Sequence, residues 1–160
     1  MKTFEKIFDL RKLSAVAATS AVAIAATTTL IQSPARAASP ADIMRLTETG
    51  ECYACDLRGA NLIGAHLIGV DLRNADLTGA TLAHANLEGA DLTGATLVNT
   101  NLSGAFLTNA LLDNTTISNV DLSNSTLIYT SLTGAEVNQV DLVGADVLNT
   151  PISIGGSYDQ

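Results

Sequence analysis

A large aliphatic residue recurs at every fifth position of the chain from Leu57 to Ile152. The twenty positions of this row are Leu57, Leu62, Leu67, Leu72, Leu77, Leu82, Leu87, Leu92, Leu97, Leu102, Leu107, Leu112, Ile117, Leu122, Leu127, Leu132, Val137, Leu142, Val147 and Ile152. The residue two places before each of them is small, and in eleven cases it is Ala. The residue directly before is Asp or Asn in ten cases, and the residue two places after is Gly or Asn in sixteen.

A period of five matches neither the 3.6 residues per turn of an α-helix nor the two-residue alternation of a strand. Gly and Asn adopt positive φ easily, so the chain can turn once in every repeat. About four short segments per coil would keep each large residue, and the small residue before it, facing inward. We call the segments around Leu57, Leu62, Leu67 and Leu72 faces one to four. The repeat therefore predicts an all-β solenoid of about five coils.

The composition narrows the function classes. The 160 residues are 47% hydrophobic but only 4% aromatic, and 15% are charged. These values argue against an aromatic-centred globule and against a charged disordered tail. The formal net charge of −8 leaves no basic surface for gripping phosphates. The chain is therefore not expected to bind nucleic acid.

Repeats such as Ala75-Asp76-Leu77-Thr78-Gly79 and Ala90-Asp91-Leu92-Thr93-Gly94 resemble those of the pentapeptide-repeat family. The resemblance covers residues 55–154 and implies a right-handed quadrilateral β-helix. The segment LTETGECYACDL, residues 46–57, is similar to the starts of cyanobacterial members. The resemblance therefore implies the periplasm or the thylakoid lumen as the compartment.

The N-terminus has the features of a secretory signal peptide. Basic residues precede an uncharged stretch, 14–31, and the small residues Ala35 and Ala37 stand at −3 and −1 of a cut after Ala37. A retained membrane anchor is the alternative, although the stretch is weakly hydrophobic. Removal of residues 1–37 would leave three arginines against fourteen acids, a net charge of −11. No stable membrane insertion is expected after cleavage.

Residues 38–54 are predicted to form a helical cap, because the ends of a solenoid expose unpaired backbone. Ser39 is the expected N-cap, Asp42 its capping-box partner, and Gly50 ends a helix of about 40–49. Three residues of this helix, Ile43, Leu46 and Met44, are expected to cover the first coil. The tail, 155–160, offers only Tyr158 as cover besides Ile154, so the C-terminal end is either a dimer contact or loosely folded.

Cys52 and Cys55 are the only cysteines. In an oxidising compartment a disulfide is the economical interpretation, joining the cap to the first inward position. Free thiols, a redox pair and a metal site remain as alternatives, although zinc would need two further ligands. The only histidines, His66 and His84, make a weak site without a third ligand, and exposed surface residues are the simpler interpretation. No metal or cofactor is predicted.

The acidic residues suggest a second function. Some pentapeptide-repeat proteins mimic DNA and bind type II topoisomerases, and an acidic rod is compatible with that role. Mapped by face, the acids form no continuous stripe: Asp56, Asp76 and Glu136 fall on face one, Asp121 and Asp141 on face two, Glu88 and Asp146 on face three, and Asp71, Asp91 and Asp113 on face four. DNA mimicry is therefore the alternative rather than the leading prediction.

Outward apolar residues gather on face three. Phe106, Ile128 and Leu148 fall on successive coils, with Leu111 and Tyr129 at the flanking edges. A cluster of this kind is typical of a docking or dimerisation surface, whereas single exposed apolar residues are common everywhere. Stacking that only stabilises the sheet is the alternative.

A filled rod provides no concave site for a nucleophile, a base and a stabilising group, so no enzyme activity is predicted. The leading prediction is an exported, non-catalytic interaction or structural module. It would bind an unknown protein partner and exist as a monomer or as an end-to-end or face-mediated dimer.

Overall fold

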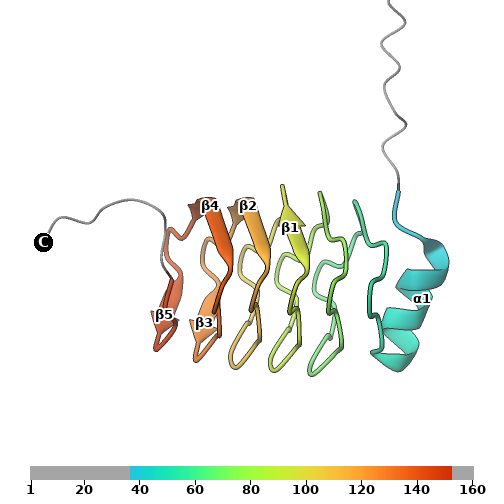
Figure 1. Ribbon diagram of the computed structural model, residues 1–160, viewed down its shortest axis with the longest axis horizontal. Helices are drawn as coiled ribbons and strands as arrows, with labels where there is room; N and C mark the ends of the chain where they lie inside the picture. The colour runs from blue at the N-terminus through green and yellow to red at the C-terminus, as the bar shows by residue number, and fades with distance from the viewer. Residues whose placement is uncertain (1–36, 153–160) are drawn as a thin grey trace, which may run out of the picture. The chain divides into compact units, whose positions relative to one another are not determined.

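The structure, a computed structural model, describes residues 37–152, and these form a stack of coils with one short helix at its N-terminal end (Figure 1). The helix is α1 (Pro40–Thr49). The strands are β1 (Thr96–Val98), β2 (Thr116–Asp121), β3 (Thr126–Ile128), β4 (Glu136–Asp141) and β5 (Asp146–Leu148). Most of the predicted signal peptide and the tail 155–160 lie outside the described residues.

All backbone pairing between coils is parallel and joins residues twenty positions apart. β1, β2 and β4 form one sheet in that order, and β3 pairs with β5 in a second. Isolated bridges continue the same register through the earlier coils, as between Asp56 and Asp76. The first bridge joins Glu51 to Asp71, four residues before the predicted start at position 55. A twenty-residue register places four five-residue repeats in each coil.

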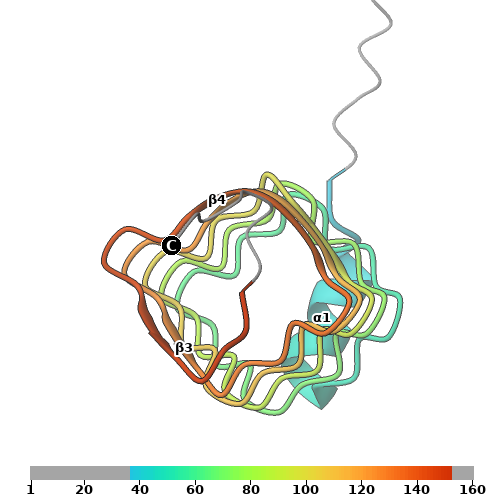
Figure 2. The ribbon, with the colours of Figure 1, turned by 60° about the vertical axis from the view of Figure 1, so that its left-hand side comes forward.

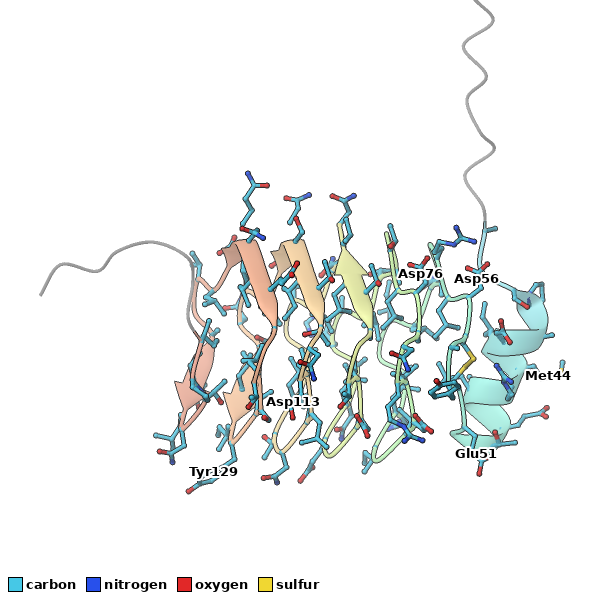
Figure 3. All side chains as sticks on the ribbon, in the orientation of Figure 1. Met44, Glu51, Asp56, Asp76, Asp113 and Tyr129 are labelled. Atoms are coloured by element: carbon cyan, nitrogen blue, oxygen red, sulfur yellow. A yellow bond between two sulfur atoms is a disulfide. The ribbon has the colours of Figure 1, made fainter. Side chains whose placement is uncertain are left out.

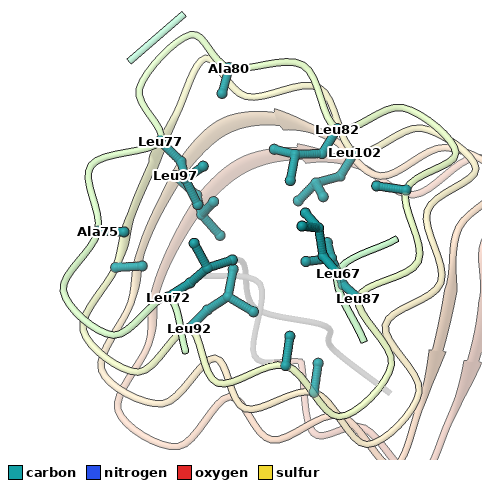
Figure 4. Packing of buried hydrophobic residues seen from close by; sticks show 14 of the residues in the cluster. Leu67, Leu72, Ala75, Leu77, Ala80, Leu82, Leu87, Leu92, Leu97 and Leu102 are labelled. Carbon is teal, nitrogen blue, oxygen red and sulfur yellow. The ribbon is translucent and has the colours of Figure 1, made fainter. Parts of the chain in front are cut away.

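The interior is filled by the large aliphatic residues and the small residues that precede them. Leucines of successive coils stack on one another and point toward the centre from four sides, as Leu77 and Leu97 do (Figure 4). Leu57, Leu72 and Leu107 are fully buried, and Ala75 and Ala90 are buried beside them. An alanine side chain is short, so it allows the walls of each coil to approach closely. This arrangement explains why both positions are so uniform in the sequence.

Hydroxyl groups replace the inward alanine in several C-terminal repeats without leaving a polar atom unsatisfied. The Thr100 and Thr130 hydroxyls donate to the Leu77 and Leu107 carbonyls at 3.0 and 2.7 Å. Ser125 donates to the Leu122 carbonyl within its own turn at 2.6 Å. Among the described residues, no buried side-chain nitrogen or oxygen lacks a hydrogen-bond partner. Each buried hydroxyl therefore keeps the hydrogen bond that burial makes necessary.

The Asp or Asn before each large residue has a local function. Its side-chain oxygen accepts the backbone N–H two residues later, as Asp76 does from Thr78 at 3.0 Å. The same Asx turn occurs at Asn61, Asp71, Asn86, Asp91, Asn101, Asp121 and Asp141. The turn that follows has positive φ, at Gly79 for example. Sequence preference and backbone geometry therefore agree at each corner.

α1 covers the N-terminal end of the stack much as predicted. The Ser39 hydroxyl accepts the Asp42 N–H at 3.3 Å, and Gly50 ends the helix with φ of 71°. Leu46 is only 1% exposed, and Ile43 packs partly against the core. The expectation for Met44 was wrong, because its side chain is 59% exposed and points away from the coils (Figure 3).

The predicted capping box is also incomplete. The Ser39 N–H donates to the Asp56 carbonyl at 2.9 Å, so it is already paired with the first coil. Asp42 instead accepts the Asp56 N–H at 3.1 Å and the Arg45 guanidinium at 3.0 Å. Asp42 therefore connects the helix to the stack, and it does not pair with the Ser39 N–H as a capping box requires.

The C-terminal end of the described stack has no comparable cover. Val147, at an inward position of the last coil, is 40% exposed, and Val137, Leu142 and Ile152 are only partly buried. A hollow of about 340 Å³ lies there, lined by Leu132, Thr133, Gly134, Ala135, Val137 and Pro151. In the described part of the chain, no helix has the length and apolar character needed to span a membrane.

Candidate interaction surface

The five apolar residues predicted to form a docking surface are all at least partly exposed. Phe106 is 50% exposed, Tyr129 60%, Leu148 52% and Leu111 40%. Ile128 is half-buried. We call these five residues the apolar cluster. Tyr129 projects from the edge of the stack next to β3 (Figure 3). Its backbone N–H donates to the Leu148 carbonyl at 2.9 Å, which fixes it to the following coil.

The apolar cluster is not one straight column. Ile128 of β3 pairs directly with Leu148 of β5, so these two side chains stack. Phe106 pairs with Asn86 on one side and Thr126 on the other. Leu111 likewise pairs with Asp91 and Ser131, across the corner on face four. The single ladder expected from the sequence is therefore a broader patch around one corner of the stack. Figure 2 shows the coils of the stack nearly end-on.

Acidic side chains border this patch. Asp146 precedes Leu148 by two residues on β5, and Asp91 lies directly beneath Leu111 in the preceding coil. Asp113 follows Leu111 by two residues. Its carboxylate accepts hydrogen bonds from the Ser131 hydroxyl and, at 2.8 Å, from the Thr133 N–H. Glu88 is exposed one coil below Phe106. The patch therefore has an apolar centre and an acidic edge.

Two arginines, Arg58 and Arg73, lie on the N-terminal coils, and each contacts acids of two successive coils. Arg58 contacts Asp56 at 2.7 Å and Asp76 at 3.4 Å. The hydrogen bond to Asp56 raises the pKa of Arg58, desolvation partly opposes this, and the charges of Asp56 and Asp76 raise the pKa further by smaller amounts. Asp56 and Asp76 lie on neighbouring coils close to the helix end (Figure 3).

A second arginine bridge lies on face four. Arg73 contacts Asp71 at 2.6 Å and Asp91 at 3.8 Å, and it lies 5.7 Å from the centroid of the Tyr53 ring. The hydrogen bond from Arg73 lowers the pKa of Asp71 below its ordinary value of 3.8. These bridges neutralise part of the acidic charge on the first coils.

The pairing between coils also shows which acidic residues form columns along the stack. The longest acidic column runs through Glu51, Asp71 and Asp91 and ends at Leu111. Glu51 joins the face-four acids, although it precedes the repeats that begin at position 55. Other columns hold two acids in succession, as at Asp121 and Asp141. Among the described residues, no acidic column runs the length of the stack.

The predicted disulfide between Cys52 and Cys55 is present. Both cysteines are buried, and the Arg45 guanidinium lies 2.8 Å from the Cys55 sulfur. Cys52 occupies the inward position that leucine takes in later coils, five residues before Leu57. This additional repeat does not follow from the row of large aliphatic residues, because cysteine stands at its inward position.

The two histidines are exposed, and the structure gives them different positions. His66 pairs with Asn86 in the strand register of face three, whereas His84 occupies a corner with φ of 58°. Within residues 37–152, no group of three or more His, Cys, Asp or Glu side chains could hold a metal ion.

A polar groove on the corner between faces one and two was not anticipated from the sequence. Its volume is about 580 Å³, and it is lined by Asn99, Thr100, Asn101, Asn119, Val120, Asp121, Gln139, Val140 and Asp141. The Asn119 amide donates to Asn99 at 2.7 Å. Two amides of this groove therefore hydrogen-bond to each other across neighbouring coils.

Comparisons with known proteins identify the family of this chain. The family model described as Pentapeptide repeats matches residues 55–94 and 90–127 in eight copies. A pentapeptide-repeat protein from the Arabidopsis thaliana thylakoid lumen is 30% identical, over 60% of this chain and 70% of that one, with a TM-score of 0.38. One from the cyanobacterium Cyanothece 51142 is 29% identical, over 69% and 96%, with a TM-score of 0.31.

QnrB1, a plasmid-mediated fluoroquinolone resistance protein, is 20% identical over 61% of this chain and 60% of its own, with a TM-score of 0.31. Proteins with curated descriptions give no match. The chain belongs to the pentapeptide-repeat family. Members of this family form right-handed β-helices and are generally non-catalytic structural or interaction modules.

Proposed function

We propose that the protein is an exported, non-catalytic interaction module that binds a protein partner through the apolar cluster. Its body would be a right-handed quadrilateral β-helix of about five coils, freed by removal of residues 1–37. The compartment would be the periplasm or the thylakoid lumen. The features of the N-terminal sequence and the buried disulfide support export, since disulfides persist in oxidising compartments.

The observation that carries this proposal is the exposure of Phe106, Tyr129 and Leu148 on one patch of an otherwise well-filled stack. Large aromatic side chains bury much area when a partner docks, and Tyr is enriched among residues that dominate binding energy. The inward positions are filled by Leu and Ala, so binding on the outer faces is the function that this architecture favours.

Affinity capture from the exported fraction tests the proposal, with residues 38–160 in the oxidised state as bait. The Phe106→Asp/Leu148→Asp variant should lose the partner. Ile63→Asp/Val143→Asp is the matched control, because it changes two exposed apolar residues of face two and adds the same charge. Purified partner should then bind the wild type and the control equally. Retention by the face-three variant would contradict the proposal.

The alternative function is that of an acidic DNA mimic that inhibits a type II topoisomerase. The sequence after His84 favours this alternative. Residues 85–152 contain seven acids and no Lys, Arg or His, so the segment is uniformly acidic. A supercoiling assay with gyrase separates the two functions. Inhibition that survives Phe106→Asp/Leu148→Asp would favour the mimic, whereas no inhibition at tens of micromolar protein would eliminate it.

A further inference from the structure

The charges around the apolar cluster differ from those on the first coils. Near α1, the acids Asp56, Asp71 and Asp76 are paired with Arg58 or Arg73. Around the cluster, Glu88, Asp113 and Asp146 have no such partner, because no Lys, Arg or His follows His84 in the chain and the arginine contacts of the described residues end at Asp91. The coils that present the cluster therefore carry uncompensated negative charge.

We propose that the apolar cluster binds a protein segment whose bulky apolar side chains are flanked by Lys or Arg, an inference that rests on the proposed function. Apolar side chains at the centre of an interface supply most of the affinity once water is excluded. Charges at the rim supply partner choice and a faster association rate. An acidic rim around an apolar centre is complementary to a basic, amphipathic segment.

The same negative charges disfavour other classes of ligand at this patch. Two copies docked through it would bring Glu88, Asp113 and Asp146 against the same acids of the second copy, and like charges facing each other at an interface are costly. Anionic lipid headgroups and nucleic acids would be repelled for the same reason. The charge pattern therefore selects a cationic protein partner.

The dimensions of the patch fit a short segment. Neighbouring coils are about 4.8 Å apart and outward side chains on one strand are about 6.6 Å apart. The patch extends from the coil of Phe106 to that of Leu148, two coils further along. Two or three apolar anchors with basic residues on either side would cover it.

A peptide array tests this inference without knowledge of the natural partner. Peptides of about fifteen residues would combine basic, neutral or acidic flanks with apolar or polar centres, and labelled mature protein would be applied to them. Peptides with basic flanks and apolar centres should be retained. Their dissociation constants would then be measured by fluorescence anisotropy at low and at physiological salt.

Two pairs of variants separate the contributions of charge and apolar contact. Glu88→Gln/Asp146→Asn should weaken binding of the retained peptides about tenfold at low salt, whereas Asp121→Asn/Asp141→Asn, the same charge change on face two, should change it less than about twofold. Phe106→Ser/Leu148→Ser should abolish binding, and Ile63→Ser/Val143→Ser should leave it unchanged. Thermal unfolding of each variant establishes that it is folded.

The possible results distinguish the two proposals. If peptides bind through Phe106 and Leu148 but basic and acidic flanks bind equally, the inference of a cationic partner is overturned and the interaction module stands. Equal weakening by the face-two and face-three charge variants would also overturn it, since binding would then follow net charge alone. If no peptide is retained, the inference is overturned, and the capture experiment above decides the proposed function separately.

Discussion

Some Asn and His side chains at the corners of the stack pack against a glycine of the next coil and need the space that its missing side chain leaves. A Cβ atom added to Gly94, Gly134 or Gly144 would lie 2.4, 2.5 or 2.6 Å from the amide oxygen of an Asn twenty residues earlier. At Gly104 the added atom would lie 2.4 Å from His84 Nδ1. These glycines therefore meet two requirements, a positive φ and room for a neighbouring side chain.

Comparison of two glycines separates these requirements. Gly89 and Gly104 both have φ of 65°, but an added Cβ at Gly89 meets nothing within 4 Å. Gly89→Ala should cost about 1–2 kcal/mol of unfolding free energy from backbone strain alone. Gly104→Ala should cost about 0.5–1.5 kcal/mol more, because His84 is forced from its rotamer. Urea denaturation would measure both.

His84→Gly supplies the control, since glycine suits φ of 58° at this position. In the His84→Gly background, Gly104→Ala should cost no more than Gly89→Ala. If the extra cost persisted without the imidazole, steric contact with His84 would not be its cause.

The pKa of Asp71 provides a prediction about pH. Because Arg73 lowers this pKa in the folded state, the pair stabilises the protein fully above the ordinary value of 3.8 and loses its effect as pH falls below it. The unfolding free energy of Asp71→Asn should therefore depend less on pH between about 5 and 3 than that of the wild type. Asp121→Asn is the control, because among the described contacts Asp121 has no arginine partner. Equal pH dependence in both variants would contradict the prediction.

Among the secondary-structure elements, α1 presents one face to the stack and another to water. Leu46 is buried against the first coil, whereas Met44, two residues earlier, is exposed. Leu46→Ala should therefore cost about 2–5 kcal/mol of unfolding free energy. Met44→Ala should stay within about 0.5 kcal/mol of the wild type. Thermal and chemical unfolding of both variants would test this, and similar losses in the two would show that the helix is not anchored through Leu46.

The ends of α1 could be predicted from the sequence, but its connection to the stack could not. Ser39 and Gly50 act locally, so their residue types were sufficient to place the boundaries. Asp42 was expected to accept the Ser39 N–H, but that N–H donates to the Asp56 carbonyl, and Asp42 accepts the Asp56 N–H, fourteen residues away in sequence, instead. Which partner is nearest depends on how the helix is seated, and a repeat pattern carries no information about that.

At the scale of the whole molecule, the five-residue period placed the buried residues well, because position in the repeat decides which side chains face inward. It described the interaction surface less well. Phe106 and Ile128 share a face, but they stand before and after their central leucines and so lie in different columns. The charge contrast between the two halves is present in the sequence, since no Lys, Arg or His follows His84, but which acids pair with Arg58 and Arg73 depends on the register between coils.

Stability should decrease along the stack toward its C-terminal end. The Glu136 and Asp146 amides donate to the preceding coil at 2.8 Å, and the Asp76 and Thr96 amides make equivalent bonds at 2.9 Å. The hydrogen bonds to the preceding coil are therefore equivalent. The difference is whether a following coil packs against these residues. The coil of Asp146 has a neighbour on one side only among the described residues, and Val147 beside it is 40% exposed. In a repeat architecture each unit is stabilised by contacts with its neighbours, so the last coil should open first.

Native-state hydrogen exchange would test this gradient. The Glu136 and Asp146 amides should exchange at least about tenfold faster than those of Asp76 and Thr96, which corresponds to about 1.4 kcal/mol less opening free energy. The measurement should be repeated at tenfold lower protein concentration, because a second copy docked on the open end would protect the last coil only when the protein is concentrated. Protection of Glu136 and Asp146 equal to that of the central coils at both concentrations would mean that some part of the same chain covers this end.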